Sequence, residues 1–232
     1  MNTCVVVPTY QERENIEPFV RAVFAQLPST RILVVDDSSP DGTAGSVRGM
    51  QAEFPALSLR VRPRKEGLGR AYVDAFELVL SDASVDRVIM MDADFSHDPA
   101  DLPRLLARTE DLVVGSRYIH GGGAEGWERW RRALSSGGNF YSRWVTGVPL
   151  SDLTGGFNAI RAARLRTLDL HRLKSSGYSF QIELKFMLWK EGASAAEVPI
   201  IFHKRRSGES KITKHIILEG VLAPWRLRFR RT

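Results

Sequence analysis

Short apolar runs alternate with amphipathic stretches through the first half of the chain. The runs are rich in β-branched residues, and the segments after the first four have apolar positions at helix-like spacing. The apolar runs lie at 3–7, 31–35, 57–61, 86–91 and 111–115. Alternation of strand and helix in this order predicts an α/β fold, with a mostly parallel central sheet and helices on both of its faces.

The alternation breaks after about residue 120. A glycine-rich loop at 121–126 is followed by a basic, aromatic and amphipathic segment at 127–145. Further on, 179–192 has a helix-like pattern and 195–205 a strand-like one, and the chain ends apolar and then basic. No internal repeat or low-complexity linker separates these segments from the first half. The whole chain is therefore expected to form a single domain with an amphipathic C-terminal third.

Composition is that of a soluble globular protein. Of the 232 residues, 43% are hydrophobic and 26% are charged. A chain of this length and hydrophobic content can form an apolar core without stabilising cross-links. The single cysteine, Cys4, excludes an internal disulfide framework, is expected to be an inert core residue, and indicates a reducing compartment. We see no signal peptide and no run of about 18 apolar residues, so no membrane-spanning helix is expected. The expected localisation is cytoplasmic.

The positive charge is unevenly distributed. The formal net charge is +6, and arginine and lysine concentrate from residue 129 onward. Such a balance favours polyanionic partners, which could be nucleic acid, anionic lipid or phosphorylated ligands. Acidic residues at the expected strand ends would repel a nucleic-acid backbone, and no nucleic-acid-binding motif is present. We therefore expect no nucleic-acid partner.

Polar residues follow four of the five expected strands. The first exits into Pro8–Glu12, the second into Asp36–Thr43, the fourth into Asp92–Asp94 and the fifth into Ser116–Tyr118. The carboxyl ends of parallel strands meet at one edge of a sheet, where α/β proteins bind their ligands. The pattern predicts a binding cleft lined by three acidic sites and one arginine.

Asp92 and Asp94 come directly after a buried strand. Side chains two residues apart in extended chain share a face, and two carboxylates so placed are tolerated when a cation lies between them. Oxygen ligands suit Mg²⁺ or Mn²⁺, which complete their shell with phosphate oxygens and water. Helix capping is the alternative, but Asp98, followed by Pro99, already fits that role. The pair therefore indicates a metal that holds the diphosphate of a nucleotide.

Other motifs admit plainer interpretations. Residues 38–43, SSPDGT, are interpreted as a turn and the start of a helix. For Asp37, the sequence leaves two roles open: a structural role in this turn, or recognition of a nucleotide base. GLGRAY at 67–72 lacks the third glycine of a dinucleotide fingerprint and is interpreted as a helix start on a tight turn. His97 and His203 are expected to be surface or hydrogen-bonded structural residues.

Several motifs together resemble one family. VVVPTYQERENI, VVDDSSPDGT, MDADFSHDP, VGSRY and RRSGESK, in this order and spacing, are similar to those of the dolichol-phosphate mannosyltransferases (polyprenol-phosphate mannose synthases), inverting GT-A glycosyltransferases of family 2. The resemblance spans residues 4 to about 220. It implies a single GT-A (Rossmann-like) domain over 1–232, with a nucleotide-sugar-binding half at 1–120 and an acceptor-binding, membrane-interface half at 121–232.

The resemblance also implies an activity and its residues. The reaction would transfer mannose from GDP-mannose to a polyprenyl (dolichyl-type) phosphate with inversion, using Mg²⁺ or Mn²⁺. Asp94 would be the main metal ligand, with Ser96 where some members have a metal-binding glutamine and others a serine. The nucleotide-sugar site would comprise Pro8, Tyr10, Glu12, Val35, Asp37, Asp92, Ala93, Asp94, Arg117, Arg205 and Lys211. The acceptor phosphate would meet Arg117, Arg131 and Ser210, and Asp94, Arg117 and Asp152 would be catalytic.

The chemistry agrees with this assignment. A polyprenyl phosphate has a second pKa of about 6, so it is largely dianionic at neutral pH and is already a nucleophile. It needs no strong general base, but it needs cations that bring two polyanions together. The basic second half of the chain suits that need. Asp152 is expected to orient the mannose rather than to abstract a proton.

The lipid acceptor implies a membrane surface. The Trp-rich segment at 127–145 and the apolar-basic C-terminus could lie in the interface plane, or a separate membrane-anchoring subunit could recruit the protein. We expect a peripheral protein on the cytoplasmic face of a membrane. Alternatives are the same fold using UDP-glucose or another nucleotide sugar, and a non-catalytic subunit, against which the intact DAD, GSRY and RSGESK motifs argue.

Overall fold

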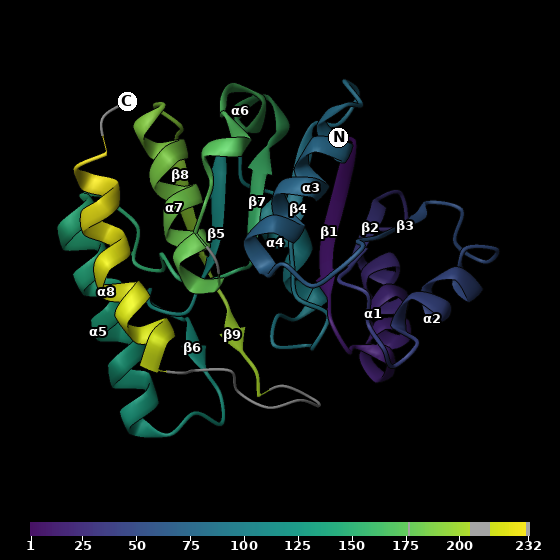
Figure 1. The fold of residues 1–232 in the computed structure, drawn as a ribbon, viewed down its shortest axis with the longest axis horizontal. Coiled ribbons are helices and arrows are strands. Elements are labelled where there is room, and N and C mark those ends of the chain that lie inside the picture. Colours follow the sequence, from purple (N-terminus) through teal and green to yellow (C-terminus); the bar gives the residue numbers. More distant parts are fainter. Residues whose placement is uncertain (176, 205–213, 231–232) are drawn as a thin grey trace.

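A seven-stranded sheet forms the centre of the molecule (Figure 1). The computed structural model describes residues 1–175, 177–204 and 214–230, with the backbone alone at 214–219. The strands lie in the order β3-β2-β1-β4-β7-β5-β8, and only β7 runs antiparallel to its neighbours. They are β1 (Thr3–Thr9), β2 (Arg31–Asp36), β3 (Leu57–Val61), β4 (Arg87–Met90), β5 (Leu112–Ser116), β7 (Asn158–Arg161) and β8 (Ala195–Pro199). The expected α/β fold with a mostly parallel sheet is confirmed.

Helices cover both faces of this sheet. The side chains of β1 show why, because Val6 packs into one apolar core while Val5 and Val7 pack into the other. The first core lies under α3 (Leu68–Leu80), α6 (Ala162–Thr167) and α7 (Gly177–Lys190). The second lies under α1 (Arg13–Gln26), α2 (Thr43–Met50) and α4 (Leu102–Leu106). Cys4 is buried in the first core, as expected, and burial raises the pKa of its thiol to about 11.

Local signals in the sequence set two of the helix starts. Gly67, with φ of +94°, precedes α3, which confirms that GLGRAY begins a helix on a tight turn. A Cβ at Gly69 would lie 2.4 Å from the carbonyl oxygen of Ser175, so the glycine permits a close approach of two segments. The Asp98 side chain accepts a hydrogen bond from the Ala100 N–H at 2.9 Å and caps the 3₁₀ turn η1 (Pro99–Asp101), as expected.

The C-terminal third adds a pair of helices beside the sheet. In Figure 1, α5 (Arg129–Thr146, teal) and α8 (Lys214–Arg228, yellow) lie next to each other, and α5 extends further toward the edge where β1 ends. The Tyr141 hydroxyl donates to the Val221 carbonyl at 2.7 Å, and the Trp144 and Trp225 rings are 6.2 Å apart. The amphipathic character of this third is confirmed, because α5 buries one face and exposes another that carries Phe140.

The remaining strands are short. The segment expected as one strand at 195–205 divides into β8 and β9 (Ile201–Phe202), and β9 pairs with β6 (Gly123–Ala124) in a separate two-stranded sheet. A second 3₁₀ turn, η2, spans Leu170–Arg172.

In the part of the chain that the structure describes, none of the helices has the length and apolar character needed to cross a bilayer.

Candidate active site

The polar strand ends do meet at one edge of the sheet. Pro8 of β1 is in register with Val35 of β2, and Thr9 is in register with Asp36. The Thr9 hydroxyl donates to one Asp36 oxygen at 2.9 Å, and the Ser39 N–H donates to the other at 2.9 Å. Asp36 is therefore occupied in fixing the two loops, whereas the next residue, Asp37, is the carboxylate with which we associate recognition of a base.

Asp37 has a buried partner that the sequence analysis missed. Arg62 directly follows β3 and is 2% exposed, and its Nη1 donates to Asp37 Oδ1. Its Nε donates to Asp74 at 2.6 Å and its Nη2 to Glu66 at 2.8 Å. A guanidinium held by three carboxylates is fixed in place, and it fixes the orientation of Asp37. The available signal was its place in the sequence, because Arg62 directly follows the third apolar run.

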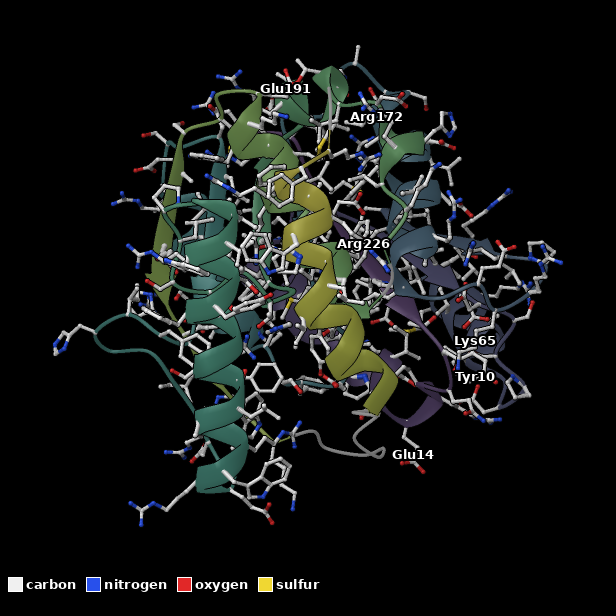
Figure 2. All side chains as sticks on the ribbon, turned by 60° about the vertical axis from the view of Figure 1, so that its left-hand side comes forward. Tyr10, Glu14, Lys65, Arg172, Glu191 and Arg226 are labelled. Carbon is white, nitrogen blue, oxygen red and sulfur yellow. The ribbon has the colours of Figure 1, made fainter. Side chains whose placement is uncertain are left out.

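Tyr10 and Glu12 lie in the loop after β1, at the same edge. The Glu12 N–H donates to the Thr43 hydroxyl at 3.0 Å, which joins this loop to the start of α2. Figure 2 shows Lys65 beside Tyr10, and the Lys65 ammonium lies 3.5 Å from the centroid of the Tyr10 ring. A cation from the loop before α3 thus lies against a residue expected at the nucleotide.

The DADFSH turn after β4 brings oxygen atoms close together. Phe95 has a left-handed φ of +59°, which is unusual for a bulky residue and marks a strained turn. Within this turn the Ser96 N–H donates to Asp94 Oδ1 at 3.0 Å, and Asp94 is only 5% exposed. The Ser96 hydroxyl oxygen is buried and has no hydrogen-bond partner among the described residues. Asp94 and Ser96 therefore lie close together, and the Ser96 hydroxyl lacks a hydrogen-bond partner among the described residues.

The oxygen atoms of Asp94 and Ser96 fit an open Mg²⁺ or Mn²⁺ site rather than a closed structural metal site. No group of three or more His, Cys, Asp or Glu side chains that could hold a metal occurs in the described ranges, so a closed structural site is not built there. Mg²⁺ and Mn²⁺ need only one or two carboxylates when phosphate oxygens and water complete the shell. Asp94, with the unsatisfied Ser96 hydroxyl beside it, suits such an open site.

His97 is held differently from the expectation. The ring is buried, stacks on Phe157 at 5.1 Å and meets Phe202 edge-on at 5.3 Å, and its Nδ1 has no hydrogen-bond partner among the described residues. Burial lowers its pKa to about 4, so the ring is neutral at pH 7. Aromatic packing therefore replaces the surface or hydrogen-bonded position that was expected. His203 does follow the expectation, with its Nδ1 2.7 Å from a Glu125 oxygen.

Arg117 and Asp152 form a buried ion pair. Nε and Nη2 of Arg117 each donate to a different Asp152 oxygen at 2.7 Å, and the Arg117 backbone N–H adds a third bond at 3.0 Å. Burial would raise the pKa of Asp152, but the charge and hydrogen bonds of Arg117 outweigh it and hold that pKa below its usual value. Both Asp152 oxygens are thus directed at Arg117, and the pair positions a cation after β5.

An apolar groove of about 450 Å³ begins at Arg117 and extends between α5, α7 and α8. Arg131, predicted to bind the acceptor phosphate, lines the same groove, and its guanidinium lies 4.5 Å from the centroid of the Trp127 ring. Ser135, which lines the groove, was not predicted; its hydroxyl accepts a hydrogen bond at 2.6 Å from the hydroxyl of Tyr118, which directly follows Arg117. The predicted residues Arg205, Ser210 and Lys211 lie outside the described residues.

Comparison with solved structures shows which fold this chain has. Glucosyl-3-phosphoglycerate synthase from Mycobacterium tuberculosis, in complex with Mn²⁺ and uridine-diphosphate-glucose, is 17% identical with a TM-score of 0.69, over 98% of this chain and 78% of that one. A mannosyltransferase from Pyrobaculum calidifontis, in complex with GDP-Man and Mn²⁺, is 18% identical with a TM-score of 0.56, over 98% and 70%. These likenesses establish the GT-A fold.

Sequence relatives make the assignment narrower. An undecaprenyl-phosphate mannosyltransferase of Micrococcus luteus is 40% identical over 96% of this chain and 92% of its own length. A polyprenol monophosphomannose synthase of Mycolicibacterium smegmatis is 41% identical over 98% of this chain and 88% of its own length. The protein-family model for glycosyl transferase family 2 matches residues 4–168 of this chain. The chain belongs to glycosyl transferase family 2 and is a glycosyltransferase.

Proposed function

We propose that this glycosyltransferase moves mannose from GDP-mannose to a polyprenyl phosphate with inversion, giving a polyprenyl phosphate β-mannose and GDP. The observation that carries the proposal is the position of Arg117, which directly follows β5 and also lines the apolar groove that contains Arg131. The names of the two sequence relatives support mannose as the sugar and a polyprenyl phosphate as the acceptor. The choice of GDP-mannose rests on the resemblance of the complete motif set.

The acceptor in this proposal needs positioning more than activation. Its phosphate is largely dianionic near neutral pH, so an oxygen can attack the sugar C1 without losing a proton to a base. Arg117 and Arg131 would bind that phosphate at the mouth of the groove, and the apolar walls would receive the first isoprene carbons. Asp152 then acts through Arg117, because both of its oxygens already accept hydrogen bonds from that side chain.

The donor would lie across the carboxyl ends of β1, β2 and β4. Asp37, fixed by Arg62, can accept hydrogen bonds from ring and amino N–H groups of a base, and Tyr10 lies at the same edge. A Mg²⁺ or Mn²⁺ ion held by Asp94, with Ser96 beside it, would neutralise negative charge on the departing diphosphate. Arg117 lies where the two phosphate groups would approach each other, so it lowers their mutual repulsion.

We also propose that the protein binds the membrane surface through α5 and α8. Phe140 and Trp144 are 74% and 68% exposed on α5, and Phe229, just after α8, is 72% exposed. Arg143 and Arg226 are exposed on the same two helices. Aromatic rings interleaved with arginine suit the headgroup region of an anionic bilayer. Co-sedimentation with anionic vesicles at low salt tests this; failure to bind would favour a membrane-anchoring subunit.

A transfer assay tests the reaction and the donor together. Labelled GDP-mannose and labelled UDP-glucose are each offered with a short polyprenyl phosphate, with and without EDTA, and label in the lipid phase is measured. We expect label from GDP-mannose alone, and only when divalent metal is present. Label from UDP-glucose alone would refute GDP-mannose as the donor. Undiminished transfer in EDTA would refute the requirement for a divalent metal, and no transfer from either nucleotide sugar would refute the proposed function.

A further inference from the structure

The loop that carries Asp152 is held by a buried lysine. Lys185 lies on α7, is fully buried, and directs its ammonium at three carbonyl oxygens of this loop. Its Nζ donates to the carbonyl oxygens of Asp152 at 2.9 Å, Leu153 at 3.2 Å and Gly155 at 2.7 Å. A lysine is seldom buried unless its charge is compensated and its three donors are used. Here all three donors hold one stretch of backbone.

The N–H groups of the same loop are bound by other side chains. Glu197 of β8 accepts from the N–H groups of residues 151 and 152 at 2.9 and 3.0 Å. Asn139 of α5 accepts from those of residues 153 and 154 at 2.8 and 3.0 Å. Side chains from α5, α7 and β8 thus replace the ladder or helix bonds that buried backbone normally requires. The conformation of the loop therefore depends on them.

The loop in turn holds Arg117. Asp152 accepts both guanidinium bonds at 2.7 Å, and the Thr154 hydroxyl lies 2.9 Å from Arg117 Nη2. Arg117 is one of the two arginines among the described residues that line the apolar groove, and the proposed function places the acceptor phosphate there. We propose that Lys185 is a positioning residue that sets how Arg117 meets the acceptor phosphate, by holding loop 151–155. This role rests on the proposed function.

The charge around Lys185 makes its role sensitive to pH. Burial lowers the Lys185 pKa to about 7; Asp152 opposes this, Arg117 adds to it, and Glu197 opposes it. The Arg117 pKa is raised, the Asp152 pKa is lowered and His97 has a pKa of about 4, so these three groups do not change charge near neutral pH. When Lys185 loses its proton, the loop loses one donor and the site loses one positive charge.

The first test separates the acceptor from the donor. Lys185→Met keeps the length of the side chain and removes the ammonium, and Lys190→Met makes the same change at an exposed lysine of the same helix. We expect Lys185→Met to raise the KM for farnesyl phosphate roughly tenfold to hundredfold, since displaced positioning groups cost up to about a hundredfold. The KM for GDP-mannose should stay within about twofold, and Lys190→Met should resemble the wild type.

A pH profile distinguishes this role from a purely structural one. In the wild type, kcat/KM for farnesyl phosphate should fall above a pH of about 7, as Lys185 is deprotonated, and this limb should be absent from Lys185→Met. The wild-type profile needs no variant, so a Lys185→Met protein that fails to fold does not prevent the test. A wild type with no alkaline limb overturns the inference.

The two proposals fail in different ways. A wild type that transfers no sugar to any polyprenyl phosphate refutes the proposed function, and the role of Lys185 with it. An active wild type combined with an unchanged acceptor KM in Lys185→Met refutes the role of Lys185 alone. Equal loss of donor and acceptor affinity would mean that Lys185 supports the fold generally, which also refutes a positioning role.

Discussion

Replacing Asp152 with asparagine should destabilise the protein strongly. Asp152 accepts four hydrogen bonds: the N–H and Nε of Arg117 on Oδ2, and the Arg117 Nη2 and the Gly155 N–H on Oδ1. In either orientation, an asparagine amide would turn two of these four contacts into donor facing donor. The change also leaves the buried Arg117 charge without its counterion. Breaking a buried ion pair in this way costs about 3–5 kcal/mol of the free energy of unfolding.

Urea unfolding followed by circular dichroism measures this loss. The matched control is Glu53→Gln, which breaks an ion pair with Arg21 on the exposed surface and should change stability little. The double variant Arg117→Met/Asp152→Asn removes both charges, so it should recover part of the stability while transfer activity stays lost. An Asp152→Asn protein that unfolds within about 1 kcal/mol of the wild type would refute our account of this pair.

Three further predictions concern other parts of the molecule. Asp94→Asn should weaken Mn²⁺ binding at least about tenfold in titration calorimetry, and unchanged affinity would contradict the metal assignment. Lys185 has a pKa of about 7 when folded and about 10.5 when unfolded, so the unfolded chain binds more protons and stability should rise from pH 7 to 9; denaturation of Lys185→Met should lack this rise. Changing Phe140 to serine should reduce vesicle binding without lowering the melting temperature, because this side chain is 74% exposed.

The strands of the first half were predictable because their signal is local. Each apolar run that the sequence shows became a strand within about one to two residues. Four of these strands are buried, and a buried parallel strand must be apolar on both faces, whereas the edge strand β3 is largely exposed. The strand β7 was not predicted. It is only Asn158–Arg161, it follows a glycine pair, and its antiparallel position between β4 and β5 depends on a long-range return of the chain.

The residues of the candidate site also divide into those that the sequence predicts and those that it does not. The residues that leave the strand ends could be named in advance, because the geometry of a parallel sheet brings those ends together whatever the loops do. Their buried partners could not. Arg62 looks like a loop arginine, and Lys185 looks like one polar position in a helix, until tertiary packing encloses both of them. Which oxygen atoms each of these buried cations meets is decided by packing between elements far apart in the chain.

The antiparallel strand β7 has a consequence for synthesis of the protein. It pairs with β4 on one side and β5 on the other, so β5 has no bond to the rest of the sheet until residue 161 has emerged. At about 5–20 residues per second, a ribosome needs a few seconds to make the intervening chain. During that interval β4 has one unpaired edge and β5 is unpaired on both sides, and such apolar edges are sites for aggregation or for exchange of strands between copies. Cells that make this enzyme quickly should therefore depend on chaperones, and truncation before residue 158 should yield insoluble protein.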